Sequence, residues 1–328
     1  MDTLYPFSDS DVTQAFETLA ATLFDTTRDT DCDTCPPAPK LLIVAGAQGS
    51  GKTYLLENSL LPSGRYDNYV RLYLSAFREL HPHYAAMQAH GTLHVYEHTE
   101  AFVWALGGRV FQHAFDNHFN IIMESALDSP LFAQFPPAAV EQGYQFEVHM
   151  IACQKAFSHW STLDRCIKSL ARDELERFVP LSSIEASQLN ARAILDAFEN
   201  ACLQVPGSQI TLYHRGFDTE LQSQPLCHSR CLNPSELLPQ ADYRGVPFIT
   251  LPQLNPSFEI RRDPQANAPC SYLQYAQVVH AGIIEAAQRQ HMVQACCNSL
   301  ARAQAQMPKV PASVFRELSL YVLTYVYP

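Results

Sequence analysis

The sequence predicts an α/β fold in which helices cover both faces of a mainly parallel sheet. Apolar runs of strand length alternate with segments of helical periodicity over the first two thirds of the chain, and strands separated by helices need crossover connections. A glycine-rich loop follows the first run, at the carboxyl end of a strand, where parallel sheets bind their ligands. The runs that we expect to form strands are residues 40–45, 69–74, 120–124, 146–153 and 208–215.

The glycine-rich loop has the sequence of a phosphate-binding loop, G-x-x-x-x-G-K-[ST]. Its glycines let several backbone N–H groups point at one anion, and the following helix adds the positive end of its dipole. We expect Lys52 to contact the outer phosphates of ATP and the Thr53 hydroxyl to hold Mg²⁺. The residues expected to bind the nucleotide are Gly46, Ala47, Gln48, Gly49, Ser50, Gly51, Lys52 and Thr53. The loop alone does not distinguish a kinase from a motor, and the lack of an N-K-x-D motif disfavours a GTPase.

Two segments flank the predicted sheet. Residues 8–27 have the pattern of an amphipathic helix that Ser8 or Ser10 caps, and a polar, proline-ended linker follows. Beyond residue 224 we expect an irregular region up to about residue 270 and then a long helix over 271–306. The chain therefore divides into an N-terminal helix and linker (1–37), a nucleotide-binding domain (38–223) and a mostly helical C-terminal extension (224–328).

Composition excludes several classes of protein. The 328 residues carry a formal net charge of −11, and no basic patch with interleaved aromatic residues occurs, so we expect neither nucleic acid nor a membrane surface as a partner. The first residues, MDTLYPFSDSDVTQ, are acidic and polar, unlike a secretory signal peptide, and no apolar run has the length of a bilayer span. We therefore expect a cytoplasmic protein.

Four further segments follow the loop in order. Residues 73–84 read YLSAFRELHPHY, and residues 120–124 read NIIME. The next segment, residues 152–165, ends at Arg165. Arg177 lies in residues 175–183, and residues 212–218 read LYHRGFD. With the loop, these segments resemble the zeta toxin family of bacterial toxin–antitoxin kinases, whose pattern after the second strand is D-x-F-[KR]-x-x-H-P-x-[FY]. The resemblance covers about residues 10–222.

The resemblance implies a P-loop kinase that uses ATP and Mg²⁺. Its typical acceptor is the 3-hydroxyl of UDP-N-acetylglucosamine, whereas related effector kinases of plant-pathogenic bacteria phosphorylate the adenosine ribose of NAD. The resemblance thus determines the type of reaction better than it determines the acceptor molecule. Members are usually held by a small helical antitoxin that covers the ATP site. An effector of this kind is delivered to a target cell. The alternative location for this protein is therefore a target cell rather than the cytoplasm of the cell that makes it.

Three side chains acquire catalytic roles from this resemblance. Arg165 and Arg177 match the family's two arginines, and a guanidinium fork can hold two oxygens of the transferring phosphoryl group. Their alternative role is in surface ion pairs with neighbouring carboxylates. Glu124 ends the third strand, where its carboxylate can hold Mg²⁺ or the acceptor hydroxyl, or can simply be a solvated strand end. Arg215 and Asp218 either line the nucleotide or form a turn.

Two positions depart from the family. The family's general base is an aspartate where this chain has Ser75, and a count back from Glu124 without gaps puts Gly108 at the place of an acidic substrate contact. A serine cannot accept a proton at neutral pH without a base beside it. His81 matches the family's H-P motif and is expected to be structural.

Three interpretations of these departures stay open. Glu79, Glu97 or Glu124 serves as the base for another acceptor; or the chain is a slow kinase, because a loose phosphoryl transition state needs little help from a base. In the third interpretation the chain is a pseudokinase that binds ATP and acts through protein contacts.

Overall fold

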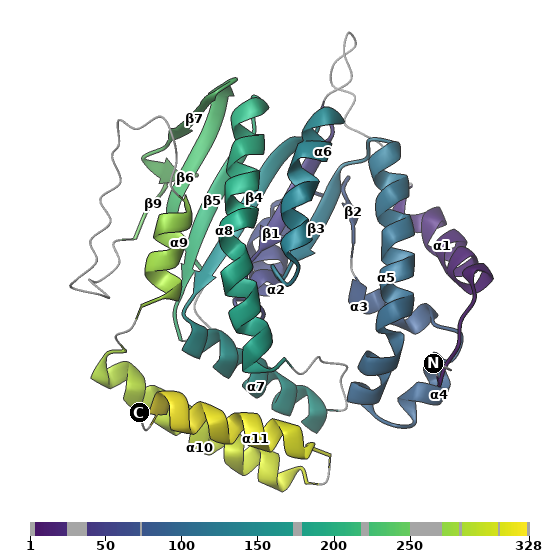
Figure 1. Cartoon of the computed structure of the whole chain (residues 1–328), viewed down its shortest axis with the longest axis vertical. Helices are drawn as coiled ribbons and strands as arrows, with labels where there is room; N and C mark the ends of the chain where they lie inside the picture. The colour runs from purple at the N-terminus through teal and green to yellow at the C-terminus, as the bar shows by residue number, and fades with distance from the viewer. Residues whose placement is uncertain are drawn as a thin grey trace.

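A seven-stranded sheet with the order β2-β3-β1-β4-β5-β6-β7 forms the centre of the molecule (Figure 1). The computed structural model describes residues 4–24, 38–72, 74–172, 179–217, 223–249, 271–281, 284–307 and 309–326. Strands β1 to β5 run parallel, and β6 and β7 are antiparallel additions at one edge. The strands are β1 (Lys40–Ala45), β2 (Val70–Arg71), β3 (Ile121–Ser125), β4 (Gln145–Cys153), β5 (Gln209–Arg215), β6 (Gln224–Asn233) and β7 (Glu236–Pro239), with a separate hairpin of β8 (Asp242–Tyr243) and β9 (Val246–Pro247).

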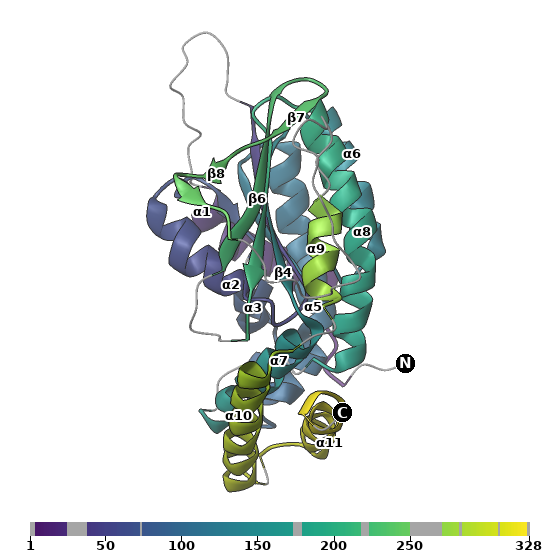
Figure 2. The same cartoon turned by 90° about the vertical axis from the view of Figure 1, so that its left-hand side faces the viewer.

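Helices pack against the sheet, and the predicted fold class is confirmed. One face packs on α5, α6, α8 and α9, whereas α2 and the β8–β9 hairpin lie on the other face (Figure 2). The helices are α1 (Asp9–Leu23), α2 (Lys52–Leu55), α3 (Leu74–Phe77), α4 (Tyr84–Gln88), α5 (Thr92–Asp116), α6 (Phe135–Glu141), α7 (Lys155–Ala171), α8 (Leu181–Gln204), α9 (Ser271–Val279), α10 (Ala286–Ala305) and α11 (Ala312–Tyr321). None of the helices in these described ranges is long and apolar enough to cross a membrane.

Strand β1 explains why its sequence is a continuous apolar run. Successive side chains of a strand point to opposite faces. Leu41 and Ile43 join the hydrophobic cluster under α5 and α8, whereas Leu42 and Val44 join the cluster under α2. All four are fully buried, as expected of a central strand in a parallel sheet covered on both faces.

The N-terminal helix is present and packs on α5, but it ends at Leu23, earlier than the predicted residue 27. Ser8 caps it through a capping box with Asp11, which satisfies two backbone N–H groups at the helix start. Arg109 of α5 donates hydrogen bonds to Thr13 and to the Asp9 carboxylate. The linker predicted to follow α1 lies outside the described residues up to residue 37.

Three further expectations about element boundaries are wrong. The second strand, predicted over 69–74, is only Val70–Arg71, and α3 begins at Leu74. Residues 224–247, predicted as irregular, form β6 to β9, of which β6 and β7 extend the main sheet. Within the predicted helix over 271–306, α9 ends at Val279 and α10 begins at Ala286.

The last two helices form a second hydrophobic cluster with α7. Trp160, Leu163 and Ile167 of α7 pack with Met292 of α10 and with Val314 and other side chains of α11. In Figure 1 these two helices lie beneath the carboxyl edge of the sheet. The C-terminal region therefore supports α7 from the side away from the sheet.

Candidate active site

The phosphate-binding loop connects β1 to α2 at the carboxyl edge of the sheet. Gly49 and Gly51 have φ angles of 77° and 91°, in the left-handed region that favours glycine. A Cβ on Gly49 would lie 2.2 Å from the carbonyl oxygen of Ser158, so the loop touches the backbone of α7. The Gly46 N–H donates to the Ser125 carbonyl (3.1 Å), which fixes the loop to the end of β3. The sequence motif thus has the strand, the curled loop and the helix that phosphate binding needs.

Lys52 folds back over the loop. Its Nζ donates to the carbonyl oxygens of Gly46 (2.8 Å) and Ala47 (3.0 Å). Burial lowers the pKa of Lys52 to about 8, although the carboxylates of Glu124 and Asp128 oppose this shift. The ammonium group is therefore charged at neutral pH and lies where phosphate oxygens can replace the two carbonyls.

Thr53 and Glu124 meet in space although 71 residues separate them. The Thr53 hydroxyl donates to Glu124 Oε2 (3.0 Å), because Glu124 pairs with Val44 at the end of the parallel β1–β3 ladder. Arg71 of β2 lies 3.5 Å from the other carboxylate oxygen. A hydroxyl beside a carboxylate supplies the hard oxygen ligands that Mg²⁺ prefers, so these two residues fit the ion.

A cavity of about 400 Å³ opens over the loop. Arg165 lines it, together with Lys168 and Arg172 of the same helix. Spacings of three and four residues put these three cations on one face of α7. The structure therefore brings Lys52 and Arg165 to one cavity, and the charge of Arg165 contributes to the lowered pKa of Lys52.

Arg215, at the end of β5, is part of the loop's support. Its Nη1 donates to the carbonyl oxygen of Gly49, and its Nη2 donates to the Ser161 hydroxyl (2.9 Å). A Cβ on Gly51 would lie 3.0 Å from Arg215 Cδ. Arg215 therefore supports the phosphate-binding loop and lines the cavity above it, and which of the two predicted roles it has, lining the nucleotide or forming a turn, stays a prediction.

The C-terminal region holds the helix that carries Arg165. The Asp164 carboxylate accepts hydrogen bonds from Ser299 Oγ (2.7 Å) and Arg302 Nη1 (3.2 Å) of α10. Lys168 Nζ lies 2.6 Å from the other Asp164 oxygen. These contacts fix the rotation of α7 about its axis, and with it the face that lines the cavity.

Three predicted residues cannot be placed in full. Arg177 and Asp218 lie outside the described residues. Ser75 lies in α3 rather than at a strand end, and its side chain is outside the description.

The count that assigned Gly108 is wrong. Tyr96 lines the cavity near the start of α5, and Gly108 lies twelve residues, or about 18 Å, farther along the helix. Gly108 is on the exposed side, and a Cβ there would meet nothing within 4 Å. Glu100 lies one turn after Tyr96, so it is on the same face of α5 as Tyr96, and its carboxylate is half-buried. A count without gaps fails here because α5 is longer than the count assumes.

Arg78 and His81 are structural in this arrangement. Arg78 is buried, donates to Thr99 Oγ1 (2.7 Å) and stacks over the Tyr96 ring, with 3.5 Å from its guanidinium carbon to the ring centroid. The buried His81 packs edge-on against Phe102 of α5. Both therefore fix the segment after β2 to α5 and help to place Tyr96. The exposed Glu79 and Glu97 lie in the same region, one on each segment.

Sequence reasoning missed several residues of the cavity. Lys168 and Arg172 follow Arg165 at helical spacing, a signal that was present in the sequence. Tyr96 carried no such signal, since nothing in the sequence shows which turn of α5 reaches the loop.

This fold and loop define a P-loop nucleotide-binding protein. The family model described as zeta toxin matches residues 25–221, more than half of the chain. The chain belongs to the zeta toxin family.

Solved structures with the same fold include a protein of the PezAT chromosomal toxin–antitoxin system of Streptococcus pneumoniae. It shares 16% identity and a TM-score of 0.59, over 94% of this chain and all 100% of that one. The AvrRxo1-ORF1:AvrRxo1-ORF2 complex with sulphate ions shares 11% identity and a TM-score of 0.51, over 97% of this chain and 87% of that one. The AvrRxo1-ORF1:-ORF2 complex with ATP shares 12% identity and a TM-score of 0.51, over 95% of this chain and 86% of that one. Among curated proteins, no relative matches the sequence.

Proposed function

We propose that this protein is an ATP-dependent small-molecule kinase of the zeta toxin type, which transfers the γ-phosphate of ATP to a sugar or ribose hydroxyl of a nucleotide-linked substrate. The observation that carries the proposal is the meeting of Lys52, the Thr53–Glu124 pair and Arg165 around one cavity. Family membership and the similarity to a complex that holds ATP support it.

The donor side of the proposed site holds the triphosphate. The backbone N–H groups of the loop and the Lys52 ammonium bind the phosphates, and Arg215 keeps the loop in its curled form. Thr53 and Glu124 would hold Mg²⁺, which neutralises charge on the phosphate oxygens. Both contributions position the γ-phosphate and reduce its negative charge.

Arg165, together with Arg177, acts on the transferring group. In the reaction the acceptor oxygen forms a bond to the γ-phosphorus and the bond from that phosphorus to the ADP oxygen breaks. The proton of the acceptor hydroxyl passes to a nearby carboxylate or to an oxygen of the transferred phosphoryl group. Charge spreads over the phosphoryl oxygens during this exchange, and a guanidinium fork that contacts two of them stabilises the transition state. Lys168 and Arg172 add positive charge to the same cavity.

The acceptor lies on the side of α3 and α5, where Tyr96 lines the cavity and Glu100 follows it. Zeta toxin relatives imply UDP-N-acetylglucosamine as the acceptor, and NAD or another nucleotide is the alternative. Glu100 would hold an acceptor hydroxyl. Ser75 occupies the place of the family's base, so transfer by this chain relies on another carboxylate or proceeds slowly.

A pseudokinase is the second candidate function. Ser75 is the observation that favours it, because no sequence neighbour of Ser75 from Tyr73 to Arg78 is a carboxylate. In that case ATP binding would order the site for contact with a protein partner. A small helical antitoxin is a further proposed partner, in line with the toxin–antitoxin system of the pneumococcal relative. We place the protein in the cytoplasm, either of its own cell or of a target cell.

Mass spectrometry of reactions with ATP and Mg²⁺ tests the proposal. UDP-sugars, NAD and free nucleosides serve as acceptors, with the intact protein, Lys52→Ala, and the matched control Lys40→Ala at an exposed lysine of β1. We expect one acceptor to gain one phosphate with the intact protein and with Lys40→Ala, but not with Lys52→Ala. ATP binding without any phosphorylated acceptor would contradict the kinase and favour the pseudokinase.

A further inference from the structure

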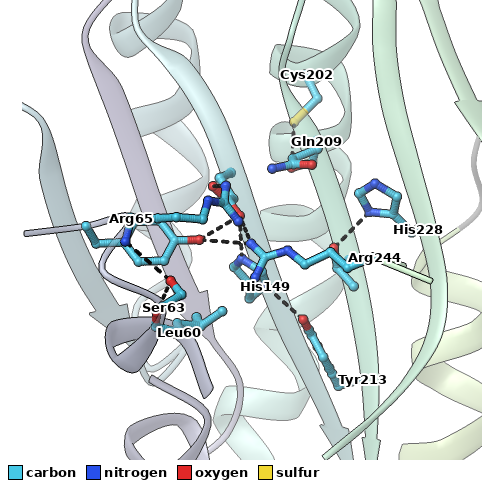
Figure 3. Close-up of polar contacts among 12 residues, drawn as sticks. Leu60, Ser63, Arg65, His149, Cys202, Gln209, Tyr213, His228 and Arg244 are labelled. Carbon is cyan, nitrogen blue, oxygen red and sulfur yellow. Dashed lines mark hydrogen bonds and ion pairs between the residues drawn. The ribbon is translucent and has the colours of Figure 1, made fainter. Parts of the chain in front are cut away.

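A second cavity, of about 460 Å³, lies on the sheet face that carries α2, at the amino ends of the parallel strands. Arg65, Arg230 and Arg244 line it, with His228 and Tyr243. These residues come from three separate parts of the chain: the turn after α2, strand β6 and the β8–β9 hairpin. Figure 3 shows Arg65 and Arg244 pointing toward one another across β4. The phosphate-binding loop lies at the opposite ends of these strands.

Two of the arginines that line this cavity are held by the carboxylate of Glu147 on β4, which is not itself a lining residue. Arg65 Nη2 (3.2 Å), Arg244 Nη2 (3.1 Å) and the Tyr66 hydroxyl (2.8 Å) donate to it. His149 Nε2 donates as well (3.2 Å), and its Nδ1 is hydrogen-bonded to the Tyr213 hydroxyl (3.0 Å) (Figure 3). Burial alone would raise the pKa of Glu147, but His149, Tyr66 and Arg65 outweigh it and hold the pKa at about 2. Glu147 is thus a fixed negative charge that orients two arginines.

Arg244 is held in an unfavourable backbone conformation. It is the first of the two residues that connect β8 to β9, with φ 54°, and Gly245 follows with φ 77°. Two-residue hairpin turns with positive φ at both positions favour asparagine followed by glycine. A non-glycine residue in the left-handed region costs conformational energy, because its Cβ crowds the backbone. The hairpin carries this cost at the position whose side chain reaches Glu147 and the cavity.

The charges around the cavity do not cancel. Three guanidinium groups line the cavity with one carboxylate, that of Asp242, and a second carboxylate, that of Glu147, is bound to Arg65 and Arg244. Arg65 and Arg244 each use one nitrogen, Nη2, for Glu147, and a guanidinium carries five N–H donors. Arg230 is exposed on β6, on the same face as His228 two residues earlier. A local excess of positive charge in a chain with a net charge of −11 marks a site for an anion.

We propose that this cavity binds a small phosphate-bearing molecule at a site separate from the phosphate-binding loop. Three guanidinium groups around one cavity match the several oxygens of a phosphate group. The volume lies in the range of ordinary small-molecule pockets and is large enough for a metabolite that carries more than one phosphate. The inference does not depend on the proposed kinase activity.

Calorimetric titration with pyrophosphate tests the site. The full chain with Lys52→Ala serves as the background, because this change weakens binding at the phosphate loop. Arg230→Ala is added to it, since Arg230 makes no contact with Glu147 among the described residues and its loss leaves the buried network in place. We expect pyrophosphate to bind the background protein and to bind at least about tenfold more weakly after Arg230→Ala, the usual effect of losing a hydrogen bond to a charged group.

Two further variants complete this test. Arg244→Asn keeps a residue that tolerates the turn and should also weaken pyrophosphate binding about tenfold. Arg192→Ala, at an exposed arginine of α8, is the matched control and should change nothing. Absence of pyrophosphate binding in the Lys52→Ala background, or equal affinity with and without Arg230, would overturn the proposal. Binding of citrate in place of pyrophosphate would overturn the choice of phosphate.

Discussion

The donor side and the acceptor side of the proposed active site differ in how completely they match a kinase. On the donor side, one cavity is lined by the loop with Lys52 and Thr53 and by the cations of α7, and Thr53 is hydrogen-bonded to Glu124. On the acceptor side, α3 carries Ser75 where the family has a carboxylate. We therefore propose that the chain keeps the donor chemistry of a kinase and differs in its acceptor or in its rate of transfer.

Removal of Arg165 should have the largest effect, because it acts on the transition state. We expect Arg165→Ala to lower the transfer rate about 10³-fold, with a much smaller change in the Kd of ATP. Steady-state kinetics and ATP titration measure the two quantities. Arg192→Ala, distant on α8, is the matched control. Equal transfer rates for Arg165→Ala and Arg192→Ala would show that Arg165 does not act on the transferring phosphoryl group.

Restoring a carboxylate on the acceptor side should raise the rate. If the rest of the site is intact, Ser75→Asp should increase transfer about 10²-fold, the lower end of what a general base contributes. Ala76→Asp adds the same charge at the neighbouring exposed position of α3 and should give no gain. A rate that Ser75→Asp leaves unchanged would mean that the acceptor side has changed beyond its base, as in a pseudokinase.

Glu100 and Gly108 make a matched pair on α5. Glu100→Gln should raise the KM for the acceptor about tenfold, since it removes a charged hydrogen-bond acceptor one turn from Tyr96. Gly108→Glu should leave the KM unchanged, because Gly108 is exposed and far along the helix. Initial rates at varied acceptor concentration measure both. An acceptor KM that changes with Gly108→Glu but not with Glu100→Gln would instead support Gly108 as the position of the acidic substrate contact.

The pH dependence of ATP binding should be the smallest effect. Because burial lowers the pKa of Lys52 to about 8, the free protein loses this proton as the pH rises above 8, and phosphate binding must then restore it. ATP affinity should be constant from about pH 6 to 7.5 and should fall by up to about tenfold at pH 9. Lys52→Arg, which stays charged over this range, should bind ATP without this fall. Calorimetry across the range measures it, and an identical profile for both proteins would refute this assignment.

The residues that the sequence places well are contiguous ones. The phosphate loop is fixed by eight neighbouring residues and their flanking strand and helix, so both its shape and its place were predictable. Glu124 was predictable for a related reason, since parallel strands end at one edge of a sheet.

Residues that depend on lengths and distant contacts were harder to predict. The position of Gly108 was miscounted because a sequence does not show how far a long helix extends beyond the site. Strand β6 was missed because it carries Pro225 and few large apolar side chains, although Cys227 and Cys231 are buried in it. The cavity around Arg65, Arg230 and Arg244 depends on residues nearly 180 positions apart, and no local pattern marks it.

Titration of the intact protein with ATP in the presence and absence of Mg²⁺ tests the central claim, that the donor side is complete. We expect one ATP site whose affinity rises with Mg²⁺, falls at least about tenfold in Lys52→Ala and is unchanged in Ser75→Asp. Absence of ATP binding, or binding that Lys52→Ala leaves unchanged, would contradict it.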